Sequence, residues 1–328
     1  MGRGLLELHL HAAPIAGVGL VTELLTSNTL VKLTISGSCD LKVGRVFLPA
    51  LKSLSLLSVN MIDHPNYSRL VDGCPVLEDL FIRDGEQPGS GSFVESASIK
   101  RLVVFTKCRP VYRDVAHDLI CFEAPSLVYL DYSSYVSESY EFIDLNLLVE
   151  VRLSLKLWES TNDIDYSDDD DDDDDDDDED DDYDYDDDDD DDDDDLKSFY
   201  GKQKPVIFGD VTKLVEGICN ITILHLSPNS LETFHFCCKS MPVFNNLLSL
   251  SIESHEEKGW QVMPLLLKSC PNLHTLAIKV LVSVSPFSEI LFCCLWCPLL
   301  YMSNFGLVVS GSYAQSNKQM RRCMHLQP

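Results

Sequence analysis

The chain has 328 residues, with 54 acidic against 25 basic side chains and a formal net charge of −29. Residues 168–195 hold 26 of these acids, so the rest of the chain, with 28 acids, is nearly neutral. This balance excludes a basic nucleic-acid-binding surface as the dominant feature. The longest apolar run, residues 290–302, contains Pro298 and is too short to span a bilayer.

The N-terminal residues lack the basic region and the uninterrupted apolar run of a secretory signal peptide. Twelve cysteines without such a signal indicate reduced, mostly buried thiols rather than a disulfide framework. We therefore expect the protein in the cytoplasm or the nucleus.

A six-residue phrase, apolar-x-x-apolar-x-apolar, recurs at intervals typical of leucine-rich repeats. Its ten copies are Leu5/Leu8/Leu10, Leu30/Leu33/Ile35, Leu51/Leu54/Leu56, Leu77/Leu80/Ile82, Ile99/Leu102/Val104, Leu127/Leu130/Tyr132, Leu148/Val151/Leu153, Ile221/Leu224/Leu226, Leu247/Leu250/Ile252 and Leu273/Leu276/Ile278. The last two apolar residues of each phrase lie two apart, so on a strand they point to one side, and parallel stacking buries them in one core. The spacing predicts an α/β fold, an irregular leucine-rich-repeat solenoid (horseshoe).

Between the strands the chain must return, and four returns have the pattern of short helices, at residues 21–26, 67–74, 211–218 and 260–270. Two of them end in a Cys-Pro pair, at Cys74 and Cys270, because proline cannot continue a helix. We expect both cysteines to be small buried side chains. A further phrase, Leu231/Phe234/Phe236, follows the preceding one too closely to form a unit and is expected in a helical return.

These patterns divide the chain into four parts. Residues 1–157 and 206–282 carry the N-terminal and C-terminal repeats. The Asp-rich insertion 158–205 is predicted to be disordered, since its like charges repel and it has almost nothing apolar to bury. Residues 283–328 show no clear period and form a divergent tail.

Three stretches resemble plant F-box proteins of the leucine-rich-repeat and FBD type. They are residues 47–56 (FLPALKSLSL), residues 73–80 (GCPVLEDL) and residues 241–276, which begin MPVFNNLLSL and end KSCPNLHTL. The resemblance covers roughly residues 4–280 apart from the acidic insertion. It implies the substrate-recognition repeats of a Skp–cullin–F-box ubiquitin ligase receptor.

Members of this family usually open with a helical F-box and end in an FBD segment. This chain begins inside the first leucine phrase, and residues 283–328 do not resemble an FBD segment. We therefore expect the recognition repeats alone, with a Skp-type adaptor as a partner only if an F-box is restored upstream.

A protein partner is best sought on the concave face, where alternate residues of each phrase point away from the core. The candidate binding residues of the middle units are Asp79, Phe81, Arg83, Arg101, Phe105, Tyr129, Asp131 and Arg152. Aromatic side chains interleaved with arginines are typical of interaction hot spots. The alternative is that neighbouring loops cover Phe81, Val103 and Phe105.

We find no P-loop, no nucleophile elbow and no His-Glu-x-x-His motif, so we expect no enzyme and no cofactor. The Cys and His groups near Cys237 and Cys293 lack a second ligand pair at zinc-finger spacing, so no metal site is expected.

Three functions remain open: a ligase substrate receptor, an acidic protein that engages basic partners through the Asp tract, and a truncated family member without ligase function. The Asp run also fits simple expansion of a short coding repeat. Neither nucleic acid nor a membrane is an expected partner.

Overall fold

A computed structural model describes residues 4–11, 25–37, 44–59, 64–83, 93–106, 119–160, 206–255, 259–281 and 306–311. The chain divides into two compact units. The first unit comprises Met1–Trp158 and Phe208–Pro328, and the second comprises Glu159–Ile207. No helix in the described part of the chain is long and apolar enough to cross a membrane.

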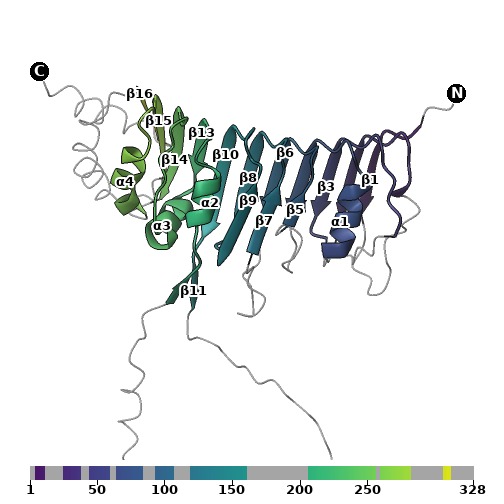
Figure 1. The fold of residues 1–328 in the computed structure, drawn as a ribbon, viewed down its shortest axis with the longest axis horizontal. Helices are drawn as coiled ribbons and strands as arrows, with labels where there is room; N and C mark the ends of the chain where they lie inside the picture. The colour runs from purple at the N-terminus through teal and green to yellow at the C-terminus, as the bar shows by residue number, and fades with distance from the viewer. Residues whose placement is uncertain are drawn as a thin grey trace, which may run out of the picture. The chain divides into compact units, whose positions relative to one another are not determined.

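The first unit is built on one parallel sheet of eleven strands, the main sheet, in the order β1-β2-β3-β4-β6-β8-β10-β13-β14-β15-β16 (Figure 1). Its strands are β1 (Glu7–His11), β2 (Lys32–Ser36), β3 (Ser53–Leu57), β4 (Asp79–Arg83), β6 (Arg101–Phe105), β8 (Tyr129–Tyr135), β10 (Glu150–Lys156), β13 (Ile223–Leu226), β14 (Ser249–His255), β15 (Thr275–Leu281) and β16 (Gly306–Gly311). The first ten each carry one of the ten leucine phrases. The predicted α/β class with parallel strands is confirmed.

The register of the main sheet explains why the phrase has its spacing. Leu54 is paired with Leu33 and Leu80, and Leu56 with Ile35 and Ile82, and the same pairing continues strand after strand. The second and third apolar residues of the phrases thus form two continuous ladders, which are buried from β2 onward. Burying one such side chain is worth roughly 1.5–3 kcal/mol, so the ladders supply much of the driving force for stacking.

The chain returns between strands partly through helices. These are α1 (His64–Asp72), α2 (Thr212–Gly217), α3 (Pro228–Cys237), the 3-10 helix η4 (Trp260–Val262) and α4 (Met263–Lys268). They confirm helical returns near residues 67–74, 211–218 and 260–270, and α3 contains the phrase that was too close to its predecessor. Of the expected helix at 21–26, residues 21–24 lie outside the described residues, and Thr26 instead forms a parallel bridge with Phe47.

Both cysteines that precede proline are buried, as expected. The Cys74 thiol donates to the Leu70 carbonyl and the Cys270 thiol to the Leu266 carbonyl, each over 3.1 Å. Burial raises the pKa of each thiol to about 12, so both remain protonated at neutral pH. These cysteines fill space at the helix ends, and their thiols are poor nucleophiles.

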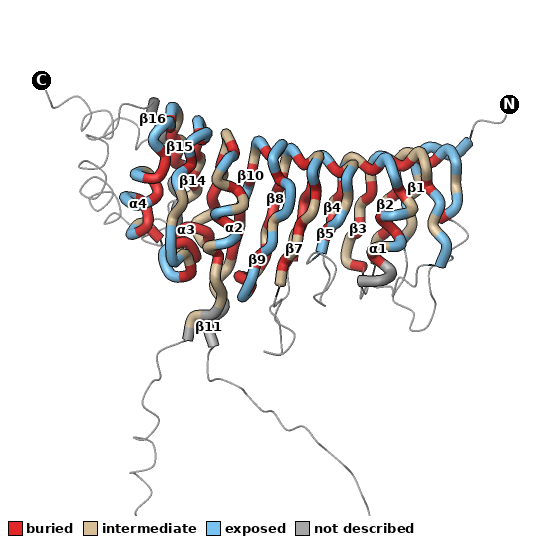
Figure 2. Tube along the Cα trace, in the orientation of Figure 1, coloured by how far each residue is buried: buried red, intermediate tan, exposed pale blue. Residues whose placement is uncertain are grey.

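Other returns are strands, which the leucine period does not predict. A three-stranded parallel sheet contains β5 (Phe93–Glu95), β7 (Leu119–Glu123) and β9 (Ser139–Ile143). It lies on the same side of the main sheet as the helices (Figure 1). Phe122 stacks on Phe142 with ring centroids 5.2 Å apart and meets the Tyr132 ring of β8 edge-on at 5.7 Å. Aromatic rings therefore fill the core between the two sheets, where Figure 2 shows buried segments.

Another strand outside the prediction is β16, in the part of the sequence that shows no leucine period. It pairs in parallel with β15, from Gly306 beside Thr275 to Gly311 beside Val280. The main sheet thus extends one strand beyond the last recognisable phrase.

Two short strands, β11 (Trp158–Ser160) and β12 (Val206–Phe208), pair in a two-stranded sheet, and most of their residues belong to the second unit. Residues 161–205, on which the prediction of disorder falls, lie outside the described residues. The boundaries proposed for the four parts of the chain stay predictions.

Candidate functional site

The face of the main sheet that points away from the helices and from β5, β7 and β9 is called here the open face. Its side chains alternate with the buried ladders, as the burial patterns of β3, β4 and β10 show. All eight candidate binding residues lie on this face, on β4, β6, β8 and β10.

The parallel register arranges these residues in rows. The first row places Asp79 beside Arg101, and Arg101 beside Tyr129. The second row places Phe81, Val103 and Asp131 side by side and continues to Arg152 and His225. Arg83 and Phe105 are neighbours in a third row. Because adjacent strands lie about 4.8 Å apart, each row forms a tight strip of side chains.

Aromatic and apolar side chains gather in the middle of the open face. The rings of Phe81 and Phe105 contact each other at a centroid distance of 6.2 Å, and both remain partly exposed. Val103 lies in the row beside Phe81 and is only 5% exposed. The alternative that loops cover these residues concerns segments 84–92 and 107–118, which lie outside the described residues.

A hollow of about 350 Å³ opens over this part of the sheet. It is lined by Ser53, Leu54, Asp79, Leu80, Phe81, Arg101, Val103, Phe105 and Asp131. Five of the eight candidate residues therefore line one hollow. Tyr129 supports its rim, since the Arg101 guanidinium lies over the Tyr129 ring at 4.0 Å from the centroid. Arg152 lies further along, 5.8 Å from the same ring, and Arg83 is exposed on the same face.

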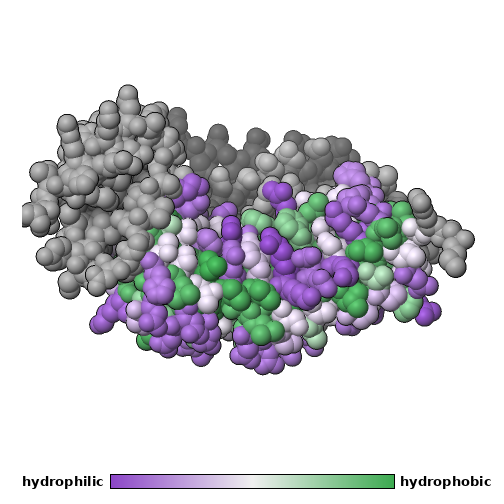
Figure 3. Space-filling model, turned by 90° about the horizontal axis from the view of Figure 1, so that it is seen from above, coloured by the Kyte–Doolittle hydropathy of each residue, from purple (hydrophilic) through white to green (hydrophobic). Residues whose placement is uncertain are grey.

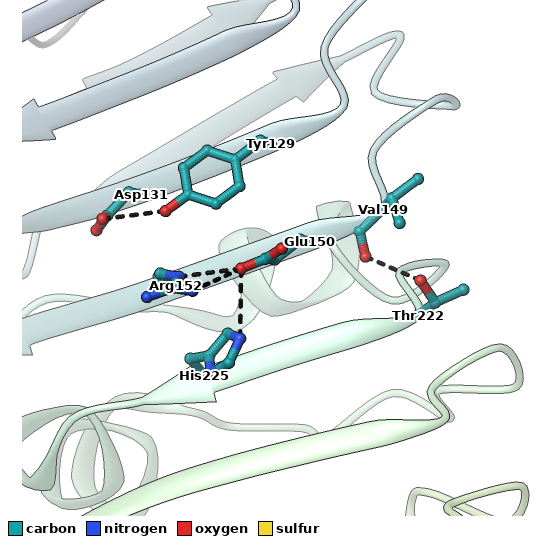
Figure 4. Close-up of polar contacts among 7 residues, drawn as sticks. All are labelled: Tyr129, Asp131, Val149, Glu150, Arg152, Thr222 and His225. Atoms are coloured by element: carbon teal, nitrogen blue, oxygen red, sulfur yellow. Dashed lines mark hydrogen bonds and ion pairs between the residues drawn. The ribbon is translucent and has the colours of Figure 1, made fainter.

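Next to the hollow lies a polar cluster on β8, β10 and β13 (Figure 4). Arg152 donates from Nε and Nη2 to Oε1 of Glu150, at 3.0 and 2.9 Å, and His225 Nε2 lies 3.4 Å from the same oxygen. The hydrogen bond from Arg152 to Glu150 raises the pKa of Arg152. Burial, followed by the charge of Arg152, lowers the pKa of His225. Oε1 of Glu150 therefore contacts both of these basic side chains.

Asp131 is in a different situation. It accepts a long hydrogen bond of 3.4 Å from the Tyr129 hydroxyl and has no basic group within ion-pair distance among the described residues. Burial raises the pKa of Asp131, although Arg152, Tyr129, Arg101 and His225 all act in the opposite direction. The pKa of Tyr129 is also raised, first by burial and then by the charge of Asp131.

His225 was not among the candidate binding residues, whereas Glu150, the third residue of its phrase, was expected on the same face as Arg152. The phrase could have indicated His225, because it occupies the fifth position of the unit that begins at Ile221. That unit follows the acidic insertion, and the candidates came only from the units before it. The register places His225 beside Arg152, although the two residues are 73 positions apart in the sequence.

A second exposed surface is the N-terminal edge of the main sheet, formed by the residues just before each strand. Lys52 and Lys100 both approach Oε1 of Glu78, at 3.6 and 3.3 Å. Further along, exposed apolar residues precede the strands, namely Val128, Leu147, Val149 and Leu248. Figure 3, seen from above, shows hydrophilic and apolar side chains next to one another. The N-terminal edge thus carries both charged and apolar side chains. The hollow lies elsewhere, on the open face.

Among the described residues, no group of three or more His, Cys, Asp or Glu side chains could hold a metal ion. Cys293, Cys294 and Cys297 lie outside the described residues. The site therefore offers aromatic contact area, charge and hydrogen bonds, which are the elements of protein recognition.

Comparison with known proteins agrees with this fold. The family described as "FBD-associated F-box protein At5g56370, LRR repeats" matches residues 1–144. The chain is 64% identical over 286 residues to the F-box/LRR-repeat protein At1g48400 of Arabidopsis thaliana, covering 86% of this chain and 55% of that protein. It is 46% identical over 290 residues to the putative F-box protein At1g64540 of the same plant, covering 85% and 57%.

The chain spans about half the length of the curated relatives that it matches. No solved structure matches it. The parallel sheet, with one phrase on each of its first ten strands, agrees with the sequence matches. Residues 1–144 match the leucine-rich-repeat model of the FBD-associated F-box protein family, and over most of its length the chain is similar to F-box/LRR-repeat proteins of Arabidopsis.

Proposed function

We propose that this chain is a non-enzymatic protein-interaction module that holds a partner protein on its open face. The observation that carries the proposal is the hollow over β4, β6 and β8, where Phe81 and Phe105 lie beside Arg101 and Asp131. Aromatic and arginine side chains dominate interaction hot spots because they combine large contact areas with directional polar groups. Family membership supports a role in protein interaction.

More specifically, we propose that the repeats form a leucine-rich solenoid with the open face on its concave side, and that they recognise the substrate of an F-box-type ubiquitin ligase. The fold supports this because each strand of the main sheet pairs only with the strands of adjacent units, as in stacked repeats. The names of the relatives support the ligase context. Assembly with a Skp-type adaptor would require an F-box.

The test is a triple variant with Phe81→Ala, Arg101→Ala and Tyr129→Ala. Partners captured by the unmodified chain are identified by mass spectrometry, and their affinities are then measured by calorimetry. Because a single hot-spot residue is worth at least ~2 kcal/mol, we expect the triple variant to bind at least roughly 30-fold more weakly. Its circular dichroism spectrum should be unchanged, since all three side chains are at least partly exposed.

The matched control changes Ser249, Ser251 and Thr275 to alanine, on the same face of β14 and β15. This control should retain full affinity. A triple variant that binds like the unmodified chain would remove the hollow from consideration as the recognition site.

A second candidate function rests on the charge of the sequence. With 26 acids in residues 168–195, the chain could engage basic proteins through this tract, independently of the open face and of ubiquitin. Such binding would weaken steeply as salt concentration rises, because exposed charges are screened. A third candidate is a family member without ligase function, which would keep the partner but support no ubiquitin transfer.

A further inference from the structure

We propose that the hollow on the open face takes a lysine or arginine side chain of the partner, with its methylene stem on Phe81 and Phe105 and its cationic head at Asp131. This inference rests on the proposed function, because it names the chemistry that the same face would recognise. Three features of the described residues carry it: an apolar floor, uncompensated carboxylates and an arginine that is already engaged.

The floor of the hollow suits a long amphipathic side chain. Phe81 and Phe105 contact each other and stay partly exposed, and Val103 fills the position beside them. Lysine and arginine bury their methylene stems on such surfaces while the charged group remains at a polar rim. A cation near the faces of the two rings gains further attraction from the negative charge density of the rings.

The carboxylates of the open face differ in whether they have a basic partner. Glu7 contacts Lys32, Glu150 contacts Arg152, and Glu253 contacts Lys279, at 2.8 to 2.9 Å. Asp79 and Asp131 line the hollow, and neither has an ion-pair partner among the described residues. A cation from a partner protein would supply the missing counter-charge.

Arg101 lies between Asp79 and Tyr129 in the first row of the sheet, and its guanidinium lies over the Tyr129 ring. The positive charges of Arg101 and Arg152 both lower the pKa of Asp131, but burial outweighs them, so the pKa is raised. The hollow therefore holds two carboxylates against one guanidinium. The net charge of −29 would also attract a basic partner over a longer distance.

Other side chains fit the hollow less well. An acidic side chain would face both Asp79 and Asp131 and would be repelled. A purely aromatic side chain would cover Asp131 and leave its carboxylate without water or a cation, which is costly for a buried charge. The basic side chain satisfies the floor and the rim together.

The test uses small probes that imitate only the end of the side chain. We propose to titrate the ¹⁵N-labelled full chain with n-butylguanidinium and with n-butylurea, its neutral analogue of nearly the same shape, and to follow the amide signals by NMR. The cation should shift the signals of β4 and β6 in a saturable manner. It should bind roughly tenfold more tightly than the urea, because a hydrogen bond to a charged group is stronger than a neutral one.

The variants separate charge from shape. Asp131→Asn should reduce the affinity for n-butylguanidinium to that for n-butylurea, and Asp79→Asn should reduce it in part. Glu253→Gln, a carboxylate change on the same face that affects an ion pair outside the hollow, should leave the preference intact. The amide spectrum of each variant shows at the same time whether the fold is preserved.

Equal affinity for the cation and the urea, absence of binding by the cation, or an undiminished preference in Asp131→Asn would each overturn the inference. These outcomes differ from failure of the proposed function. If the triple variant of Phe81, Arg101 and Tyr129 loses its partner while the cation shows no preference, the open face binds a partner of another chemistry. If the triple variant keeps its partner, the proposed function itself fails.

Discussion

At the scale of single residues, Asp131 shows how the open face departs from what stability alone would favour. Its carboxylate is half-buried on β8, and its hydrogen bond from Tyr129 is long. Burial disfavours the charged form, which is why the pKa of Asp131 lies above the ordinary value of 3.8. Residues that serve binding often reduce stability in this way.

This leads to a prediction for Asp131→Asn. A carboxyl group whose pKa is raised in the folded state stabilises the fold most below its unfolded pKa, and this contribution is lost as the pH rises through the folded pKa. At pH 7 the aspartate therefore carries its full penalty, whereas asparagine is neutral and still accepts a hydrogen bond. We expect a higher melting temperature for the variant at pH 7, with the difference shrinking as the pH falls toward 3.8.

The control is Glu253→Gln, because the Glu253 side chain is 45% exposed and ion-paired with Lys279. It should show no such gain at pH 7. Since the acidic tract titrates equally in both proteins, calorimetric scans at matched pH cancel its contribution. A less stable Asp131→Asn variant at pH 7 would contradict the argument from burial.

At the scale of elements, α3 replaces hydrogen bonds that the sheet itself lacks. β10 extends to Lys156, but its pairing with β13 ends at Leu153 beside Leu226. Ser230 of α3 supplies hydrogen bonds to β10 where this pairing ends. Its hydroxyl accepts from the Leu155 amide at 2.9 Å and donates to the Leu153 carbonyl at 2.8 Å. The helix begins with Ser227 as its N-cap, which accepts from the Ser230 amide. One buried serine thus joins a helix to a strand 75 residues earlier.

We therefore predict that Ser230→Ala is destabilising. The substitution removes the acceptor of the buried Leu155 amide, which costs about 1–3 kcal/mol, whereas the Leu153 carbonyl still accepts from the Ser227 amide at 3.0 Å. Urea denaturation followed by circular dichroism should show a clearly lower midpoint. Ser251→Ala on the open face of β14 should change it little, since exposed substitutions usually stay within about 0.5 kcal/mol. Equal midpoints for the two variants would refute the role of Ser230.

The strands of the main sheet other than β16 could be predicted because each carries its own leucine phrase, and burial of Leu54 or Leu80 needs only a neighbouring copy. The sheet of β5, β7 and β9 could not be predicted in this way. Its strands pair only because successive returns have similar paths, as in Phe93 beside Cys121 and Cys121 beside Glu141. This similarity exists only between successive units, so it leaves no periodic pattern of apolar residues within a single unit.

The candidate site, like the fold, could be predicted only in part from the sequence. Alternation along each strand indicated which side chains face outward, so Phe81, Arg101 and Asp131 were identified. Which of them contact each other depends on the register and on rotamers. The placement of Arg101 over Tyr129, and the neighbouring position of His225, required the structure.

At the scale of the whole molecule, most of the net negative charge lies in the acidic tract, which occupies a different part of the sequence from the repeats. Residues 168–195 contribute 26 of the 54 acids but no described helix or strand. The repeats depend on contacts between neighbouring units of the main sheet. Deleting Asp168–Asp195 therefore removes repulsion among clustered carboxylates without removing any helix or strand that the structure describes.

We expect this deletion to leave the melting temperature unchanged or slightly raised, most visibly at low salt, where screening of the like charges is weakest. Shortening the connection also lowers the entropy cost of closing it, by only about 0.6 kcal/mol for each halving of its length. Calorimetry at two salt concentrations measures both effects, and a deletion variant that unfolds would show that the tract is structural.

The same deletion variant distinguishes the two candidate functions. A receptor that works through the hollow at Phe81 and Asp131 should retain its partner with at most a slower association, because the tract then contributes only long-range attraction. A binder that works through the tract should lose its basic partners altogether, and the Phe81, Arg101 and Tyr129 variant should keep them.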